Sequence, residues 1–191
     1  MKKSAFFSFA IVIVSFLPAV RVHAQAFEAG TNVISAGLGL GSSIADYTYG
    51  SQTPGLSAQY ERGIWEAGPG VISLGGLIGY KGFRASAFGP NYSYTEKWNY
   101  SIFGVRGAYH YTGLDIPNLD LYGGLMLSYD NLSYSVTDNS GNFSNIGGAG
   151  SSGVELSVFA GGRYYFAGNL AGYAELGYGV SILTVGLAYK F

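Results

Sequence analysis

The chain contains no cysteine, and few of its residues carry a charge. Without cysteine it has no disulfide framework, no thiolate metal site and no lipid anchor of the lipoprotein kind. Lys, Arg, Asp and Glu make up 11% of the 191 residues, whereas soluble domains contain about 25%. Long hydrophobic runs are also missing after the first 24 residues, so no transmembrane helix is expected in that part of the sequence.

The first 24 residues have the features of an export signal. Met1–Lys3 is basic, Ala5–Leu17 is an apolar run of thirteen residues, and Val22–Ala24 ends on a small residue. Because a membrane helix needs about 20 apolar residues, an uncleaved anchor is disfavoured. We expect a signal peptide at 1–24, cleaved after Ala24, and a single barrel domain at 25–191.

Removal of that segment leaves an acidic chain that is rich in glycine and tyrosine. The basic residues fall from ten to seven against eleven acidic ones. The resulting net charge of about −4 argues against a nucleic-acid partner. Glycine occurs 31 times and tyrosine 17 times. An apolar chain of this kind without long apolar runs can satisfy its backbone in lipid as a closed β-barrel.

The final segment shows the underlying pattern most clearly. Leu183, Val185, Leu187, Tyr189 and Phe191 alternate with small or polar residues, so one face of this strand meets an apolar medium. Seven other segments alternate in the same way, at the length of about 10 residues or slightly more that a tilted membrane strand needs. The expected strands are 32–41, 56–65, 71–83, 97–111, 119–131, 154–166, 170–180 and 183–191.

The connections between these strands alternate in length. Short turns are expected at 66–69, 112–118 and 167–169, and long loops at 42–55, 84–96 and 132–153, while the connection around Ser181 is short. In membrane barrels the short turns face the periplasm and the long loops face the exterior. An even number of strands then places both termini on the periplasmic side.

The apolar face distinguishes a membrane barrel from a secreted soluble barrel, which would hide that face inside. The polar face is mostly Gly, Ser and Ala, which suits a narrow, filled lumen. Aromatic residues of the apolar face gather at the two ends of the strands, and two such girdles around an aliphatic band favour the membrane barrel. They are Tyr109, Tyr111, Tyr164, Phe166, Tyr189 and Phe191 at one end and Tyr80, Tyr129 and Tyr178 at the other.

With its export signal, eight alternating strands and terminal Phe191, the chain resembles the small eight-stranded outer-membrane β-barrels of the OmpA/OmpX type. The resemblance implies an all-β, antiparallel up-and-down transmembrane barrel in the outer membrane of a Gram-negative bacterium. It also implies a lipid-embedded monomer, inserted by the barrel-assembly machinery through a signal that includes Tyr189 and Phe191. A structural or adhesive role through the outer loops is expected, and a narrow, porin-like conduit is the alternative.

The polar face also places ionisable residues inside the barrel. Charges in a narrow lumen of low dielectric must pair, and antiparallel register brings His110 near Asp120 and Arg163 near Glu175. The set is interpreted as a salt-bridged plug, with a gate or proton relay as the alternative. Its members are Glu61, Lys81, Arg106, His110, Asp120, Asp130, Glu155, Arg163, Glu175 and Lys190.

No catalytic, cofactor or metal site is expected. His110 is the one histidine that remains after signal removal, and Ser101 and Ser128, interpreted as lumenal, lie toward the opposite end of the barrel. At about 3.3 Å per residue, His110 is beyond hydrogen-bond reach of either hydroxyl. A lipid-modifying enzyme is therefore disfavoured.

The long loops contain aromatic residues among Ser, Asn and Gly. Such residues either form an adaptable binding surface or extend the outer girdle and the strands, and the sequence supports both interpretations equally. They are Tyr47, Tyr49, Tyr92, Tyr94, Trp98, Tyr100, Tyr134 and Phe143.

Overall fold

The computed structural model describes residues 26–41, 50–90, 92–114, 116–138, 146–150 and 152–191. The predicted signal peptide, its cleavage after Ala24, and the loop residues Tyr47, Tyr49 and Phe143 lie outside these ranges. Within the ranges, no helix is long and apolar enough to cross a membrane.

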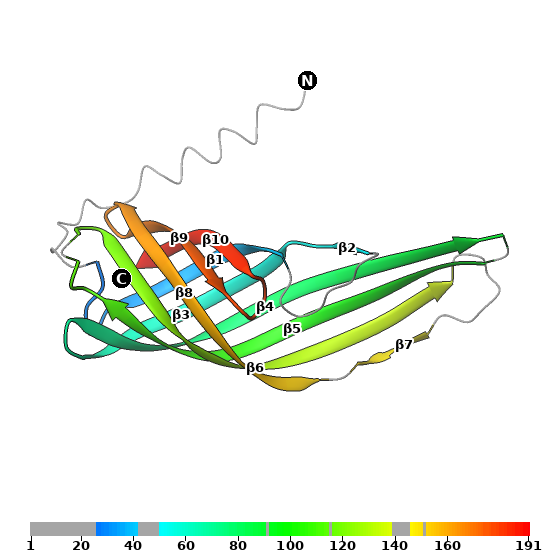
Figure 1. The fold of residues 1–191 in the computed structure, drawn as a ribbon, viewed down its shortest axis with the longest axis horizontal. Helices are drawn as coiled ribbons and strands as arrows, with labels where there is room; N and C mark the ends of the chain where they lie inside the picture. The colour runs from blue at the N-terminus through cyan, green and yellow to red at the C-terminus, as the bar shows by residue number, and fades with distance from the viewer. Residues whose placement is uncertain (1–25, 42–49, 91, 115, 139–145, 151) are drawn as a thin grey trace, which may run out of the picture.

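Eight antiparallel strands close into a barrel, with pairing that runs β1–β3–β4–β5–β6–β8–β9–β10 and returns to β1 (Figure 1). Asn32 and Phe191 exchange two backbone hydrogen bonds, of 3.1 and 2.9 Å, where the first and last strands meet. The predicted up-and-down barrel is therefore confirmed. The strands of the described chain are β1 (Asn32–Leu40), β2 (Ser51–Gln52), β3 (Gly55–Glu66), β4 (Gly70–Gly89), β5 (Tyr92–Tyr111), β6 (Leu119–Asp138), β7 (Ile146–Ala149), β8 (Gly153–Ala167), β9 (Leu170–Gly177) and β10 (Leu183–Lys190).

The apolar positions of the strands face outward. Ile78 is 58% exposed and Leu125 is 55% exposed, whereas Ser73 and Gln59 on the opposite faces are buried. Because a barrel covered in exposed aliphatic side chains cannot be stable in water, this surface is the lipid-facing one. The soluble alternative, which required an apolar interior and a polar exterior, is wrong.

The two ends of the barrel differ. One end, here named the short-turn end, has the connections 67–69, 112–118 and 168–169 and both ends of the described chain. In its two tightest turns Gly68 and Gly168 adopt φ values of 58° and 57°, a left-handed conformation that glycine adopts without steric cost. Outward-facing aromatic side chains mark both ends of the apolar band, with Tyr164 and Phe191 at the short-turn end and Tyr80 at the other.

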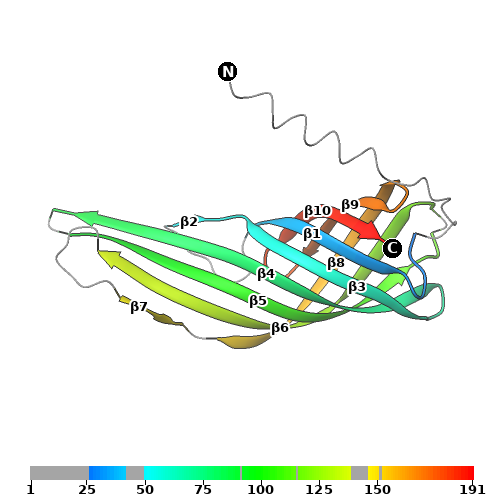
Figure 2. The same cartoon turned by 180° about the vertical axis from the view of Figure 1, so that it is seen from behind.

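Three strands extend well beyond the barrel at the opposite end, here named the hairpin end (Figure 2). β4 and β5 continue through the expected loop 84–96 and pair as far as Gly89 with Tyr92, and β6 continues to Asp138 and pairs with β7. The loop prediction is therefore wrong for 84–89 and 92–96, and also for 132–138 and 146–149. Outside the membrane both faces of a sheet can be polar, so the alternation that identifies a membrane strand disappears while the backbone pairing persists.

The membrane-facing surface can be tested with a matched pair of substitutions. Leu125→Arg puts a charge near the middle of the apolar band, and we expect the free energy of unfolding in lipid vesicles to fall by about 2–4 kcal/mol. Leu114→Arg, in the exposed turn 112–118, should cost no more than about 1 kcal/mol. Equal effects in urea titrations of the two variants would contradict the assignment of the lipid-facing band.

Candidate functional site

All the predicted lumenal residues occupy inward-facing positions, and the structure brings six of them together in two groups. One group contains four residues near the short-turn end, and the other is an ion pair closer to the hairpin end. Four residues stay apart from both groups. The first group is Glu61, His110, Asp120 and Arg163, here named the inner cluster; the second is Arg106 and Glu175; the residues outside both are Lys81, Asp130, Glu155 and Lys190.

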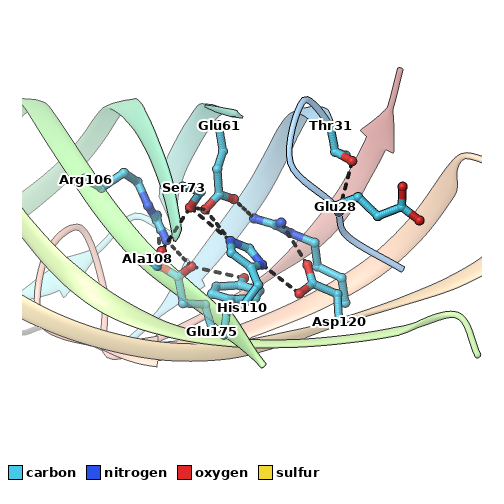
Figure 3. A network of polar contacts seen from close by, with 11 residues as sticks. Glu28, Thr31, Glu61, Ser73, Arg106, Ala108, His110, Asp120 and Glu175 are labelled. Carbon is cyan, nitrogen blue, oxygen red and sulfur yellow. Dashed lines mark hydrogen bonds and ion pairs between the residues drawn. The ribbon is translucent and has the colours of Figure 1, made fainter. Parts of the chain in front are cut away.

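In the inner cluster, four strands each contribute one side chain to a ring of alternating charge (Figure 3). His110 Nδ1 lies 2.7 Å from Asp120 Oδ1, and His110 Nε2 lies 2.9 Å from Glu61 Oε1. Arg163 donates to the remaining oxygens, 3.1 Å to Asp120 Oδ2 and through its other terminal nitrogen to Glu61 Oε2. All four side chains are buried.

The geometry of the inner cluster indicates that its net charge is zero. Both ring nitrogens of His110 face carboxylate oxygens, and an imidazole that donates a hydrogen to both of them carries a positive charge. Two cations then balance two carboxylates in a site without access to water. Because each charge is paired with an opposite one, the four groups can remain ionised in a lumen of low dielectric.

Arg106 and Glu175 form the second group, joined by two parallel hydrogen bonds of 3.2 and 2.7 Å. Tyr122 lies between the two groups, and its hydroxyl donates to Glu175 Oε2 at 3.2 Å. The Arg163 guanidinium lies over the Tyr122 ring at 4.4 Å, and that of Arg106 lies over Phe159 at 3.8 Å. The aromatic rings therefore fill the space between the ion pairs and contact both guanidinium groups.

The short-turn end of the lumen is filled by the chain segment that precedes β1. Phe27 is 1% exposed and its ring stacks on the His110 imidazole, with 3.7 Å between centroids and 8° between planes. Lys190 Nζ donates to the Ala26 carbonyl at 3.0 Å. This plug could not be predicted from the sequence, because one phenylalanine outside the alternating segments gives no periodic signal.

The hairpin end of the lumen is covered by the short connection between β9 and β10. Val180, expected in a strand that ends at 180, instead follows the end of β9 and turns its side chain into the lumen, where it is 5% exposed. A Cβ at Gly79 would lie 2.3 Å from Val180 Cγ2. The Val180 side chain therefore fits into the lumen because the residue opposite it is a glycine. Lys81 donates to Ser181 Oγ at 3.2 Å and to the Gly41 carbonyl.

The cavity beneath that turn is small. Gln59, Met126, Phe159 and Glu175 are among its lining residues, and its volume is about 20 Å³, room for about one water molecule. Lumenal side chains thus occupy the interior between the Phe27 plug and Val180. Nearer the mouth, Asp130 and the exposed Glu155 form no ion pair with a cation among the described residues.

The serine residues considered for catalysis are not near the histidine. Ser101 pairs with the outward-facing Tyr80, so its predicted lumenal position is wrong; it shares the parity of Phe103, which faces lipid. A different serine, Ser73, lies with its Oγ 3.0 Å from His110 Nε2. The spacing resembles that of a nucleophile and its base, but Ser73 is 0% exposed and its hydroxyl donates to Glu61 Oε1 at 2.6 Å.

No protein-family model and no curated protein sequence matches this chain. Among solved structures, Ail of Yersinia pestis, in complex with the heparin analogue sucrose octasulfate, shares 15% identity over 86% of this chain and 100% of Ail, with a TM-score of 0.46. Ail in a phospholipid bilayer nanodisc shares 18% identity over 85% of this chain and 99% of the other, with a TM-score of 0.45. The translocator domain of the autotransporter NalP from Neisseria meningitidis shares 14% identity over 97% of each chain, with a TM-score of 0.36. Function is therefore inferred from this chain's own residues.

The inner cluster predicts a large stability difference between two arginines. Arg163→Ala leaves two buried carboxylates with one cation, and we expect a loss of about 3–5 kcal/mol in the free energy of unfolding. Arg84→Ala, an exposed position on β4 rather than in the predicted loop, should change it by no more than about 0.5 kcal/mol. Equilibrium unfolding in lipid vesicles measures both values, and parental stability of Arg163→Ala would contradict a closed charge network.

Proposed function

We propose that this protein is a non-conducting, non-enzymatic barrel of a Gram-negative outer membrane that presents its projecting sheet to partners outside the cell. The apolar exterior and the predicted signal peptide support this location. The short-turn end then faces the periplasm and the hairpin end faces outward. Barrel-assembly machinery, reading Tyr189 and Phe191, inserts the chain, and the inserted protein is a monomer.

The observation that carries the surface role is the extension of β4, β5 and β6 beyond the barrel. Each of these strands has 20 residues, compared with 9 in β1 and 8 in β10. Membrane crossing accounts for about 10 residues of a strand. The remainder of each strand forms a sheet above the membrane. Closing the barrel does not require this sheet, whereas a binding surface does.

The inner face of this sheet, continuous with the lumenal face, is aromatic. Trp98 and Tyr134 lie at 5.6 Å between ring centroids, and the Tyr134 hydroxyl donates to Glu96 at 2.9 Å. Further out, Tyr92 and Tyr94 are 46% and 36% exposed. Rigid aromatic side chains on a strand scaffold provide contact area at a low entropic cost. These residues, expected in loops, therefore provide an ordered binding surface on strands.

The narrow conduit and the lipid-modifying enzyme receive less support. A conduit would have to pass the Phe27 plug, the inner cluster and Val180, each of which occupies the lumen. An enzyme would have to expose Ser73, whose hydroxyl is held by a carboxylate within the same closed cluster. We therefore propose that the cluster acts as a structural plug and neither as a gate nor as a proton relay.

Conductance measurements test the plugged lumen. The purified, folded protein in planar lipid bilayers should give no stable and reproducible conductance steps, because Phe27, the inner cluster and Val180 occupy the lumen at successive levels. As a control for correct insertion, the same preparation should show the slower electrophoretic migration of a folded barrel before heating. A reproducible open channel from folded protein would contradict the non-conducting proposal.

Cell binding tests the projecting sheet. Bacteria that display Tyr92→Ser/Tyr94→Ser should bind a surface coated with host extracellular matrix as weakly as bacteria without the protein, because the exposed inner aromatic face is removed. Phe88→Ser is the matched control, since Phe88 is 75% exposed on the opposite face of the same sheet, and it should keep parental binding. Parental binding by the double variant, at equal surface display, would contradict this role of the inner face.

A further inference from the structure

The outward face of the projecting sheet carries two opposed cations. Arg84 on β4 and Lys97 on β5 are directly paired in the strand register, and alternation directs both side chains away from the lumen, as for Tyr80 and Phe103. Like charges directly opposite each other on a sheet destabilise it unless an anion lies between or near them. Neither residue forms an ion pair with a carboxylate among the described residues.

The distribution of charge over the whole barrel makes this pair more unusual. Seven Lys and Arg residues follow position 25, and four of them, Lys81, Arg106, Arg163 and Lys190, face the lumen. Arg62 lies on the exterior at the short-turn end. Arg84 and Lys97 are therefore the two exterior cations of the hairpin end, and they are adjacent.

The strand alternation also separates charges of opposite sign. The two acidic residues of the described sheet extension, Glu96 and Asp138, occupy inward-facing positions, one of them bonded to Tyr134. The outward positions around the cations are instead hydroxyl- or amide-bearing residues, which can donate hydrogen bonds to phosphate and sugar oxygens. They are Ser86, Thr95, Asn99, Ser133, Ser135 and Thr137.

The height of the pair matches the headgroup layer. Tyr80, whose hydroxyl donates to Asn99 at 2.8 Å, belongs to the outer aromatic girdle that marks the interface. Arg84 is four residues further along β4, about 13 Å at 3.3 Å per residue, or about 10 Å above the girdle for a strand tilted by about 40°. Long basic side chains can reach back from there toward the interface.

We propose that Arg84 and Lys97 bind the phosphate groups of a phosphorylated lipid headgroup in the outer leaflet, with the surrounding hydroxyls and amides contacting the headgroup. Guanidinium and ammonium groups together suit a phosphate, the first through paired donors and the second as a point charge. The outward direction of both side chains, on a surface continuous with the lipid-facing barrel, favours a membrane lipid over a soluble anion. This proposal rests on the membrane embedding proposed above.

The test uses the full folded protein in phosphatidylcholine vesicles, with bisphosphorylated lipid A added as the probe. We expect lipid A to raise the unfolding midpoint of the parent, less so at high salt because salt screens exposed charges. Arg84→Gln/Lys97→Gln should bind lipid A about thirty-fold more weakly, a difference of about 2 kcal/mol for two surface cations. Arg62→Gln, an exterior cation at the short-turn end, should keep the parental shift.

Each other outcome overturns the proposal or one of its parts. If a dephosphorylated lipid A gives the same shift, the phosphates are not the ligand; if inorganic phosphate gives it, the site binds free anions and not lipid. If the double variant keeps the parental shift, the two cations are not the site. Failure of the parent to insert into vesicles would instead contradict the membrane location, which distinguishes the two proposals.

Discussion

The narrowness of an eight-stranded barrel is the constraint on which the rest of this structure depends. Every second residue of each strand must fit a lumen that excludes bulk water, so an ionisable group buried there needs hydrogen-bond partners within reach, which are neutral oxygens for Lys81 and opposite charges in the inner cluster. The inner cluster meets this requirement with two cations and two carboxylates from four strands. Glu61 of β3 contacts His110 of β5 and Arg163 of β8, so these two contacts join strands that no backbone pairing connects.

The ends of the lumen are filled by parts of the chain that do not belong to the barrel strands. Phe27 enters from the segment before β1 and lies flat on His110, and Val180 enters from the turn before β10. Glycines on the facing strands make room for both, since a Cβ at Gly63 would lie 3.1 Å from the Phe27 ring and one at Gly79 would lie 2.3 Å from Val180. Glycine at these two positions therefore allows close packing inside the barrel.

The barrel could be predicted from the sequence because lipid imposes a strict alternation of apolar and polar residues on its strands. The projecting sheet could not be predicted, because water imposes no such alternation. Within the membrane, Leu127 faces lipid and Ser128 faces the lumen, and the alternation of apolar and polar residues in the sequence shows this. Beyond it, Arg84 to Gly89 lies outside the apolar band, so its residues do not follow the membrane pattern and the sequence predicts a loop there. The lumenal charges could be named from the pattern, but their partners depend on three-dimensional register: Glu175 meets Arg106 rather than Arg163. Phe27 carries no periodic signal at all.

The unequal lengths of the strands give the molecule a direction in the plane of the membrane. β4, β5 and β6 stand above one side of the mouth, while β9 and β10 on the other side end at a turn close to the barrel rim. A partner that binds the sheet must therefore approach from one side. Both its height above the membrane and its direction around the membrane normal are then fixed relative to the barrel. Neighbouring barrels and large lipid headgroups on that side compete for the same space. For any partner that binds the sheet, rotation of the barrel in the bilayer would therefore be part of recognition.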